Sequence, residues 1–178
     1  MTRKVKIYLA GPFFTKEQQQ VATQLESLLK DATDNYEVKF FSPRQGEASQ
    51  EMKMYQVKGE QPPQDLRERV FRDNVENIDD ADLLLAYIDN FDPGTIYEVG
   101  YAYASSVPVL SFSAKGYGMN LMLAQSVIGH TRGLDELEEA LDLILSILSI
   151  EDTMKRVQEL TKFTVEYTSS AQLSEKFE

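Results

Sequence analysis

The stretch DLLLAYIDNFDPGTIYEVGYAYA, residues 82–104, decides the fold, because it predicts a buried strand that leads directly into a helix. Its first eight residues are apolar enough for a strand that is covered on both faces, as strands of parallel sheets are. The Asp-Pro-Gly sequence at residues 92–94 then breaks the chain, and a helix from residue 95 to about residue 105 follows. The carboxylate of Glu98 lies one turn into this helix, where it could either cap the helix or take part in chemistry.

The same succession of strand and helix continues on either side of this stretch. Further strands are expected at KVKIYLA (4–10), YEVKFFSP (36–43) and VPVLSFS (107–113), and SVIGHT (126–131) is a candidate for a short fifth strand. Apolar periodicity predicts helices over 15–32, 63–81 and 134–150. Strands that alternate with helices imply right-handed crossovers. We therefore predict an α/β fold with a single parallel, flavodoxin- or Rossmann-like sheet, helices on both faces and a C-terminal helical extension.

The organisation of the chain follows from this pattern. Residues 1–150 are expected to form one α/β domain, and residues 151–178 a C-terminal helix and polar tail of the same domain. We expect the tail after Phe163 to be loosely held. Residues 44–62, rich in Gln, Glu, Gly and Ser, are expected to form a long loop that is mobile or covers a ligand. The helix over 134–150 is apolar beyond a single stripe, which indicates a second packing surface.

Composition and charge narrow the classes of function. The 178 residues suffice for one domain with a real core, and the 42% of hydrophobic residues argue against disorder. The absence of Cys excludes disulfides and thiolate metal sites and fits a reducing compartment, so we expect a cytoplasmic protein. No secretory leader and no membrane-spanning run are expected. The net charge of −11 repels phosphodiester backbones, which leaves small ligands rather than nucleic acid polymers.

Ligands of open parallel sheets bind beyond the carboxyl ends of the strands. The side chains expected at those ends are two aromatics, several carboxylates and one amide. They are Gly11, Phe13 and Phe14 after the first strand, Asp89, Asp92, Gly94 and Glu98 after the third, and the segment AKGYGMNLMLAQ (114–125) after the fourth. This set suits a nucleobase stacked on an aromatic ring and a sugar held by its hydroxyl groups.

Each of these features also has a purely structural interpretation. Thr95 and Glu98 have the spacing of a capping box, and Asp92 could instead cap the helix with Pro93 at its first position. From these residues alone, a capping role for Glu98 is favoured over a catalytic one. GPFF at 11–14 lacks the pattern of a phosphate loop. His130 stands alone, so no metal site is expected.

The whole set of motifs, in order, resembles the nucleoside 2-deoxyribosyltransferase family. It comprises KIYLAGPFF (6–14), RDNVENIDDADLLLAYID (72–89), DPGTIYEVGYAYASSVPVL (92–110) and MNLMLAQSV (119–127). The patterns D-x-G-T-x-Y-E-x-G-Y-A and M-N-L-M are specific signals. The resemblance implies that Glu98 is the nucleophile that takes the deoxyribosyl group, which reverses the preference for capping. At a helix N-terminus the dipole is expected to keep this carboxylate ionised at neutral pH.

The resemblance implies roles for further residues. Tyr8 hydrogen-bonds and orients the nucleophile, Asp92 acts at the sugar and base, and Phe13 or Phe14 stacks on the base. The Asp that protonates the departing base in the family is matched by Asn74. An Asn cannot supply a proton, so the neighbouring Asp73, or Asp92, or water is expected to serve.

The M-N-L-M motif implies a shared site. In the family this segment completes the pocket of a neighbouring subunit, so Asn120 is expected at the sugar 5′-hydroxyl of the neighbour, with Met122 beside it. The broad apolar side of the 134–150 helix gives an independent reason to expect burial against another chain. We therefore expect a homo-oligomer, from dimer to hexamer, with shared active sites.

The leading hypothesis is a transferase that exchanges nucleobases between 2′-deoxynucleosides through a covalent glycosyl-Glu98 ester, with net retention. Its partners are deoxynucleosides and free bases, and it requires no cofactor and no metal. An alternative enzyme is a deoxynucleoside or deoxynucleotide N-glycosidase, in which water takes the ester. A 5′-phosphate would require cations, for which Arg44 and Lys115 are candidates. A further alternative is a non-catalytic nucleotide-sensing module in which Glu98 only caps its helix.

Overall fold

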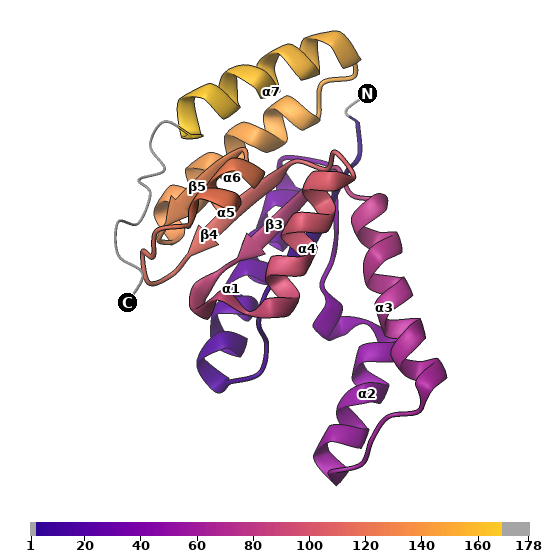
Figure 1. The fold of residues 1–178 in the computed structure, drawn as a ribbon. Coiled ribbons are helices and arrows are strands. Elements are labelled where there is room, and N and C mark those ends of the chain that lie inside the picture. Colours follow the sequence, from indigo (N-terminus) through magenta and orange to yellow (C-terminus); the bar gives the residue numbers. More distant parts are fainter. Residues whose placement is uncertain (1–2, 169–178) are drawn as a thin grey trace.

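A five-stranded, wholly parallel sheet forms the centre of the computed structural model, which describes residues 3–168 (Figure 1). The strand order is β2-β1-β3-β4-β5. The strands are β1 (Val5–Ala10), β2 (Val38–Phe41), β3 (Leu83–Tyr87), β4 (Val109–Ser113) and β5 (Gly129–Arg132). The α/β fold is therefore confirmed, and the SVIGHT segment does supply the fifth strand.

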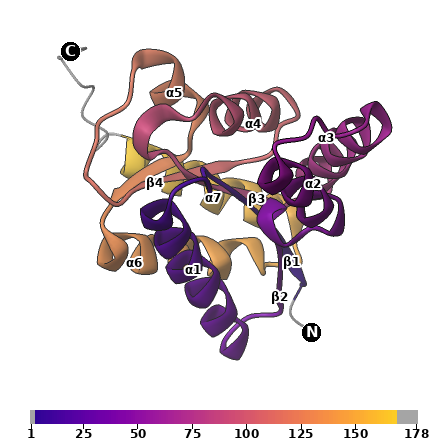
Figure 2. The ribbon, with the colours of Figure 1, turned by 90° about the horizontal axis from the view of Figure 1, so that it is seen from below.

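Helices cover both faces of the sheet, as Figure 2 shows from below. On one face lie α1 (Lys16–Asp31) and α6 (Leu134–Leu148), and on the other lie α3 (Gln64–Asp79), α4 (Pro93–Ala104) and α5 (Leu121–Ser126). Because side chains of a strand alternate in direction, β1 contributes to both cores. Val5, Ile7 and Leu9 pack toward α1 and α6, whereas Tyr8 and Ala10 pack toward α4. This alternation brings Tyr8 to the helix that carries Glu98.

The C-terminal helix α7 (Thr153–Thr168) packs beside α6, at the top of Figure 1. Phe163 of α7 is 2% exposed within the α1–α6 core, and Leu160 packs against that core. The sheet and α7 together cover most of the apolar side of α6, whereas Leu134 and Leu143 remain 37% and 39% exposed. A loosely held tail was predicted to follow Phe163 because the sequence there is polar, but helix α7 continues to Thr168. The rest of the predicted tail, 169–178, lies outside the described residues.

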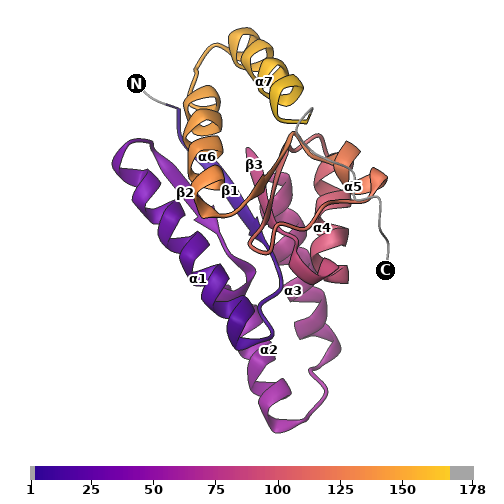
Figure 3. The same ribbon diagram turned by 90° about the vertical axis from the view of Figure 1, so that its left-hand side faces the viewer.

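The segment expected as a loop over 44–62 is mostly helical. After a short 3-10 turn, Pro43–Gln45, helix α2 runs from Glu47 to Lys58. It ends at Gly59, whose φ of 68° suits glycine at a helix C-terminus. The Gln, Glu, Met and Lys residues of α2 are good helix formers. Because α2 buries only Ala48, its sequence lacks the apolar periodicity by which an amphipathic helix is predicted. With α3 it projects beyond the sheet in Figures 1 and 3.

Two 3-10 turns complete the described elements, Ala32–Asp34 after α1 and Asp89–Phe91 after β3. Across the part of the chain that the structure describes, no helix has the length and apolar character needed to cross a membrane.

Candidate active site

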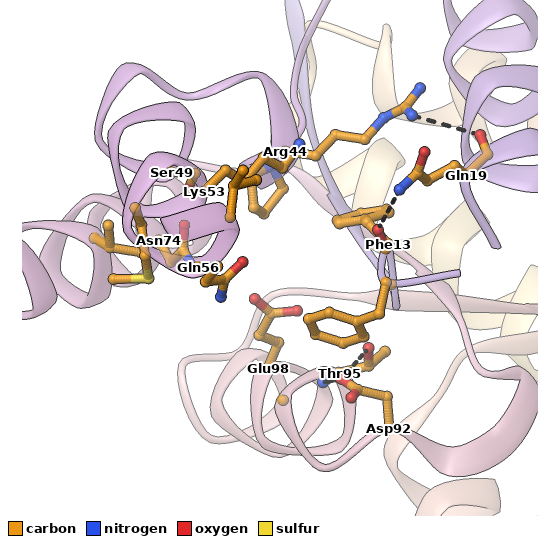
Figure 4. Close-up of a pocket in the computed structure, with 17 residues that line it drawn as sticks. Phe13, Gln19, Arg44, Ser49, Lys53, Gln56, Asn74, Asp92, Thr95 and Glu98 are labelled. Atoms are coloured by element: carbon orange, nitrogen blue, oxygen red, sulfur yellow. Dashed lines mark hydrogen bonds between the residues drawn. The ribbon is translucent and has the colours of Figure 1, made fainter. Parts of the chain in front are cut away.

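A cavity of about 420 Å³ opens where the strand order reverses, between the carboxyl ends of β1 and β3 (Figure 4). Such switch points are the usual ligand sites of parallel α/β sheets. Three groups of residues line the cavity. They are Gly11, Phe13, Phe14 and Gln19 after β1 and in α1; Asp92, Gly94, Thr95 and Glu98 at the start of α4; and Pro43, Arg44, Ser49, Met52, Lys53, Gln56, Val57, Val70 and Asn74 from the turn after β2, α2 and α3.

The start of α4 is capped by Asp92 and not by Glu98. Oδ2 of Asp92 accepts hydrogen bonds from the backbone N–H of Thr95 at 2.9 Å and from its hydroxyl at 3.1 Å. Pro93 takes the first helical position. A side chain at Gly94 would bring its Cβ to 3.1 Å from the same Asp92 oxygen, so the turn favours glycine there. Glu98 is therefore not engaged in capping.

The carboxylate of Glu98 is instead held by Tyr8, which lies 90 residues earlier in the chain. The Tyr8 hydroxyl donates a hydrogen bond of 2.6 Å to Oε1 of Glu98. Tyr8 is completely buried, and its ring stacks on Phe41 of β2 with 5.6 Å between ring centroids. A rigid strand thus fixes Oε1 of Glu98 at the lining of the cavity, and within residues 3–168 no other side chain hydrogen-bonds this carboxylate.

Burial sets the ionisation of this pair. It raises the pKa of Glu98 from 4.5 to about 7; the Tyr8 hydrogen bond acts in the opposite direction, and the nearby charge of Asp92 raises the pKa further. The pKa of Tyr8 is also raised, chiefly by burial and then by the Glu98 charge, so Tyr8 remains a proton donor. The sequence predicts that the helix dipole keeps Glu98 ionised, whereas burial acts against the charged form and raises its pKa. Glu98 lies in the second turn of α4, where the dipole effect has faded and desolvation dominates.

The remaining predicted residues divide between the cavity and its surroundings. Gly11, Phe13, Phe14 and Asn74 line the cavity, whereas Asp73 does not. Gly11 allows a close approach, because a Cβ there would lie 3.1 Å from Cβ of Tyr87. Phe14 is 74% exposed, and the ring of Phe13 lies 5.9 Å from Cζ of Arg44.

Asp89, predicted to bind substrate, lies outside the cavity lining and is fully buried. Its carboxylate accepts hydrogen bonds from the Ser113 hydroxyl at 2.5 Å and from the Lys115 backbone N–H at 3.1 Å. These bonds secure the loop after β4. Asp89 therefore acts here as a structural acceptor, a role that its sequence position could not distinguish from ligand binding.

Asn120 and Met122 also lie outside the cavity lining. Oδ1 of Asn120 accepts a hydrogen bond of 3.0 Å from the backbone N–H of Leu123 and so caps α5. Met122 is 75% exposed. Within one chain, these two side chains do not join the residues that surround Glu98.

The two cations proposed to bind a 5′-phosphate are both paired with carboxylates, and of the two only Arg44 lines the cavity. Arg44 makes two short hydrogen bonds to the buried Glu26, with 2.7 Å from Nε and 2.6 Å from Nη2. Lys115 pairs with Glu17 at 3.2 Å, away from the cavity lining. Lys53 and Gln56 of α2 line the cavity and were missed, because their segment was taken for a loop.

Comparisons with known proteins identify the family to which this chain is similar. The family model described as nucleoside 2-deoxyribosyltransferase matches residues 7–138. The solved 2-deoxyribosyltransferase of Bacillus psychrosaccharolyticus is 32% identical, covers 75% of this chain and 90% of its own, and superposes with a TM-score of 0.62. A more distant structure, the CMP N-glycosidase of Clostridium botulinum, is 16% identical over 78% of this chain and 99% of its own, with a TM-score of 0.49.

A curated relative is an uncharacterized protein of Ureaplasma parvum serovar 3, 33% identical over 110 residues. That match covers 58% of this chain and 63% of the relative, so the chain spans less than two thirds of the relative's length.

Proposed function

Because the chain belongs to the nucleoside 2-deoxyribosyltransferase family, we propose that it transfers the 2-deoxyribosyl group between nucleobases of 2′-deoxynucleosides. The observation that carries the proposal is the hydrogen bond between Tyr8 and Glu98 at the wall of a cavity of about 420 Å³. A cavity of this volume is in the range of small-molecule sites. A carboxylate with one oxygen fixed and one free is suited to attack a sugar carbon.

The first half of the reaction forms a glycosyl ester. Oε2 of Glu98 attacks the anomeric carbon, the bond from that carbon to the base nitrogen breaks, and its electron pair goes to the base. The transition state has oxocarbenium character, which a nearby carboxylate stabilises. Tyr8 keeps Oε1 in place throughout, because its own hydroxyl is fixed by the buried strand.

The second half reverses these steps with another base. A ring nitrogen of the incoming base attacks the same carbon, the ester bond breaks, and the carboxylate of Glu98 is regenerated. Two inversions at one carbon give net retention. We assign stacking on the base to Phe13 or Phe14 and contacts with the sugar to Asp92, with no metal or cofactor in either half.

We further propose that the active protein is a homo-oligomer. Asn120 and Met122 lie outside the cavity of their own chain, and Leu121 and Met122 are 60% and 75% exposed. The capping bond uses only the amide oxygen of Asn120, so its NH₂ group remains able to donate to a sugar hydroxyl of a neighbouring subunit.

One incubation tests the proposed reaction. The protein is mixed with deoxyinosine and free adenine, and the products are separated by liquid chromatography. New deoxyadenosine supports the transferase, and its absence in a Glu98→Gln variant supports the assigned nucleophile. Release of deoxyribose regardless of adenine would identify an N-glycosidase instead, and binding without turnover would identify a sensing module.

A further inference from the structure

The departing base needs a proton, and the carboxyl groups of the cavity are committed elsewhere. Among the described lining residues only Asp92 and Glu98 are acids. Glu98 becomes the ester. Oδ2 of Asp92 accepts two hydrogen bonds from Thr95 at the start of α4, and the contacts of Asp92 with substrate are assigned to the sugar. Asp73 does not line the cavity, and the amide of Asn74 has no acidic proton to transfer.

The stereochemistry of attack places the base. A nucleophile displaces a leaving group from the opposite side of the carbon. The base must therefore lie across the cavity from Glu98, toward the wall made by α2 and α3. Figure 4 shows this wall, with Ser49, Lys53 and Asn74 on it and Gln56 extending from it toward Glu98.

Lys53 is the proton donor available on that wall. It is half-buried, and no ion pair or hydrogen bond joins its ammonium group to another side chain within residues 3–168. The other cation of the lining, Arg44, is bound to Glu26 and, as a guanidinium, does not give up a proton in proteins. As the bond to the sugar breaks, the electron pair left on the base nitrogen makes it a base similar in strength to a lysine amine, so a proton can pass between them in both directions.

We propose that Lys53 protonates the departing base and recovers the proton from the incoming one. The inference rests on the proposed transferase function. In the first half, the ammonium of Lys53 loses a proton to the base as the bond between sugar and base breaks, which leaves a neutral amine and a neutral free base. In the second half, the incoming base gives its N–H proton to that amine as its nitrogen attacks the ester. One proton and one glycosyl group are thus exchanged without a net change.

Lys53 lines the cavity together with two amide side chains, those of Asn74 and Gln56. The amides of Asn74 and Gln56 can donate and accept hydrogen bonds at the edge of the base. Lys53 follows Ser49 by four residues and precedes Gln56 by three, so all three share one face of α2. The wall therefore offers neutral amides that can hydrogen-bond the base and one ammonium group that can transfer a proton to it.

A matched pair of substrates tests the proposal. Deoxyinosine requires a proton on its departing base, whereas 7-methyl-2′-deoxyinosine already carries a positive charge on the base and requires none. Lys53→Met should lower kcat/KM about 100-fold with deoxyinosine, within the usual range for general acids, and less than about threefold with the methylated substrate. Lys58→Met is the control, since Lys58 lies at the exposed end of the same helix outside the cavity lining.

Three outcomes would overturn the role of Lys53 while the wild type remains active. Equal losses with both substrates would indicate a role in the placement of α2. Full activity in Lys53→Arg would indicate that charge alone matters, because arginine does not transfer the proton. A loss confined to deoxyinosine 5′-monophosphate would indicate a phosphate contact. A wild-type chain that turns over neither nucleoside would refute the proposed function itself, and the role of Lys53 with it.

Discussion

Tyr8→Phe removes the only group seen to hold the Glu98 carboxylate within the described residues, and its effect should depend on pH. The lost interaction is a hydrogen bond of 2.6 Å from a buried hydroxyl to Oε1 of Glu98. Hydrogen bonds to charged groups contribute about 1.5–3 kcal/mol, and 1.36 kcal/mol corresponds to one pKa unit. Burial already raises the pKa of Glu98 to about 7. Loss of the Tyr8 hydrogen bond should therefore move that pKa to roughly 8–9.

The consequence for the rate follows from the ionised fraction of Glu98, the proposed nucleophile. At pH 7 about half of the wild-type Glu98 is ionised, and in Tyr8→Phe about 1–10% is, so kcat/KM should fall about 5- to 50-fold. At pH 9 most of the loss should disappear. The measurement is kcat/KM for base exchange between pH 5.5 and 9.5, in which the acidic limb should move upward by one to about two pH units.

Tyr87→Phe is the matched control. Tyr87 is a buried tyrosine on the adjacent strand β3, but it belongs to the core on the opposite face of the sheet. The Tyr87→Phe substitution also removes a buried hydroxyl, but it should leave the acidic limb of the pH profile of kcat/KM unchanged. A Tyr8→Phe variant that loses the same factor at every pH would refute the link to ionisation, and a wild-type limb near pH 4.5 would refute the effect of burial on Glu98.

Four further predictions concern the nucleophile, the cofactor and the assembly. Glu98→Gln should increase the free energy of unfolding at pH 8 by up to about 3 kcal/mol and by nothing near pH 4, as measured by urea titration. The sign follows because the pKa is raised in the folded state from 4.5 to about 7, so stability is lost as pH rises between these values. A 2-fluoro-2-deoxy-arabinosyl nucleoside should leave a covalent adduct on Glu98, and mass spectrometry that places it elsewhere contradicts the assignment. Turnover should survive prolonged EDTA treatment; activity that is lost and then restored by a divalent ion counts against this. Mixed Glu98→Ala and Asn120→Ala chains should regain activity after reassembly, whereas mixed oligomers without activity would show that each site comes from one chain.

The sheet and its order of elements could be predicted because a strand such as β3 is an apolar run, which is buried when helices cover both faces of a sheet. Leu83, Leu84 and Leu85 are completely buried, and such a run has no exposed alternative. Helix α2 could not be predicted in this way, since it is held by its intrinsic propensity and by contacts with α3 such as the ion pair between Arg69 and Glu51. Neither helix propensity nor such polar contacts produce an apolar periodicity in the sequence. The residues that α2 brings to the cavity, Lys53 and Gln56, were missed for the same reason.

The sequence also could not decide whether Asp92 or Glu98 caps the start of α4. Asp92 precedes Thr95 by three residues, and Thr95 precedes Glu98 by three, so both spacings fit a cap equally well. The deciding group is Tyr8, which no local pattern near residue 98 contains. Only the pairing of β1 beside β3, with Tyr8 aligned to Leu84, brings the hydroxyl to the second turn of α4. A tertiary contact therefore settled a question of local structure.

The energetics of Glu98 argue that its position serves chemistry. A capping carboxylate lies in the first turn, exposed to water, where backbone N–H groups and the helix dipole favour its charged form. Glu98 lies one turn further on, where burial disfavours that form and a single hydroxyl offsets part of the cost. In terms of stability alone, a neutral side chain would do better at this position. The ionised form of a buried carboxylate suits the proposed attack, because desolvation strengthens its interaction with positive charge that develops on the sugar.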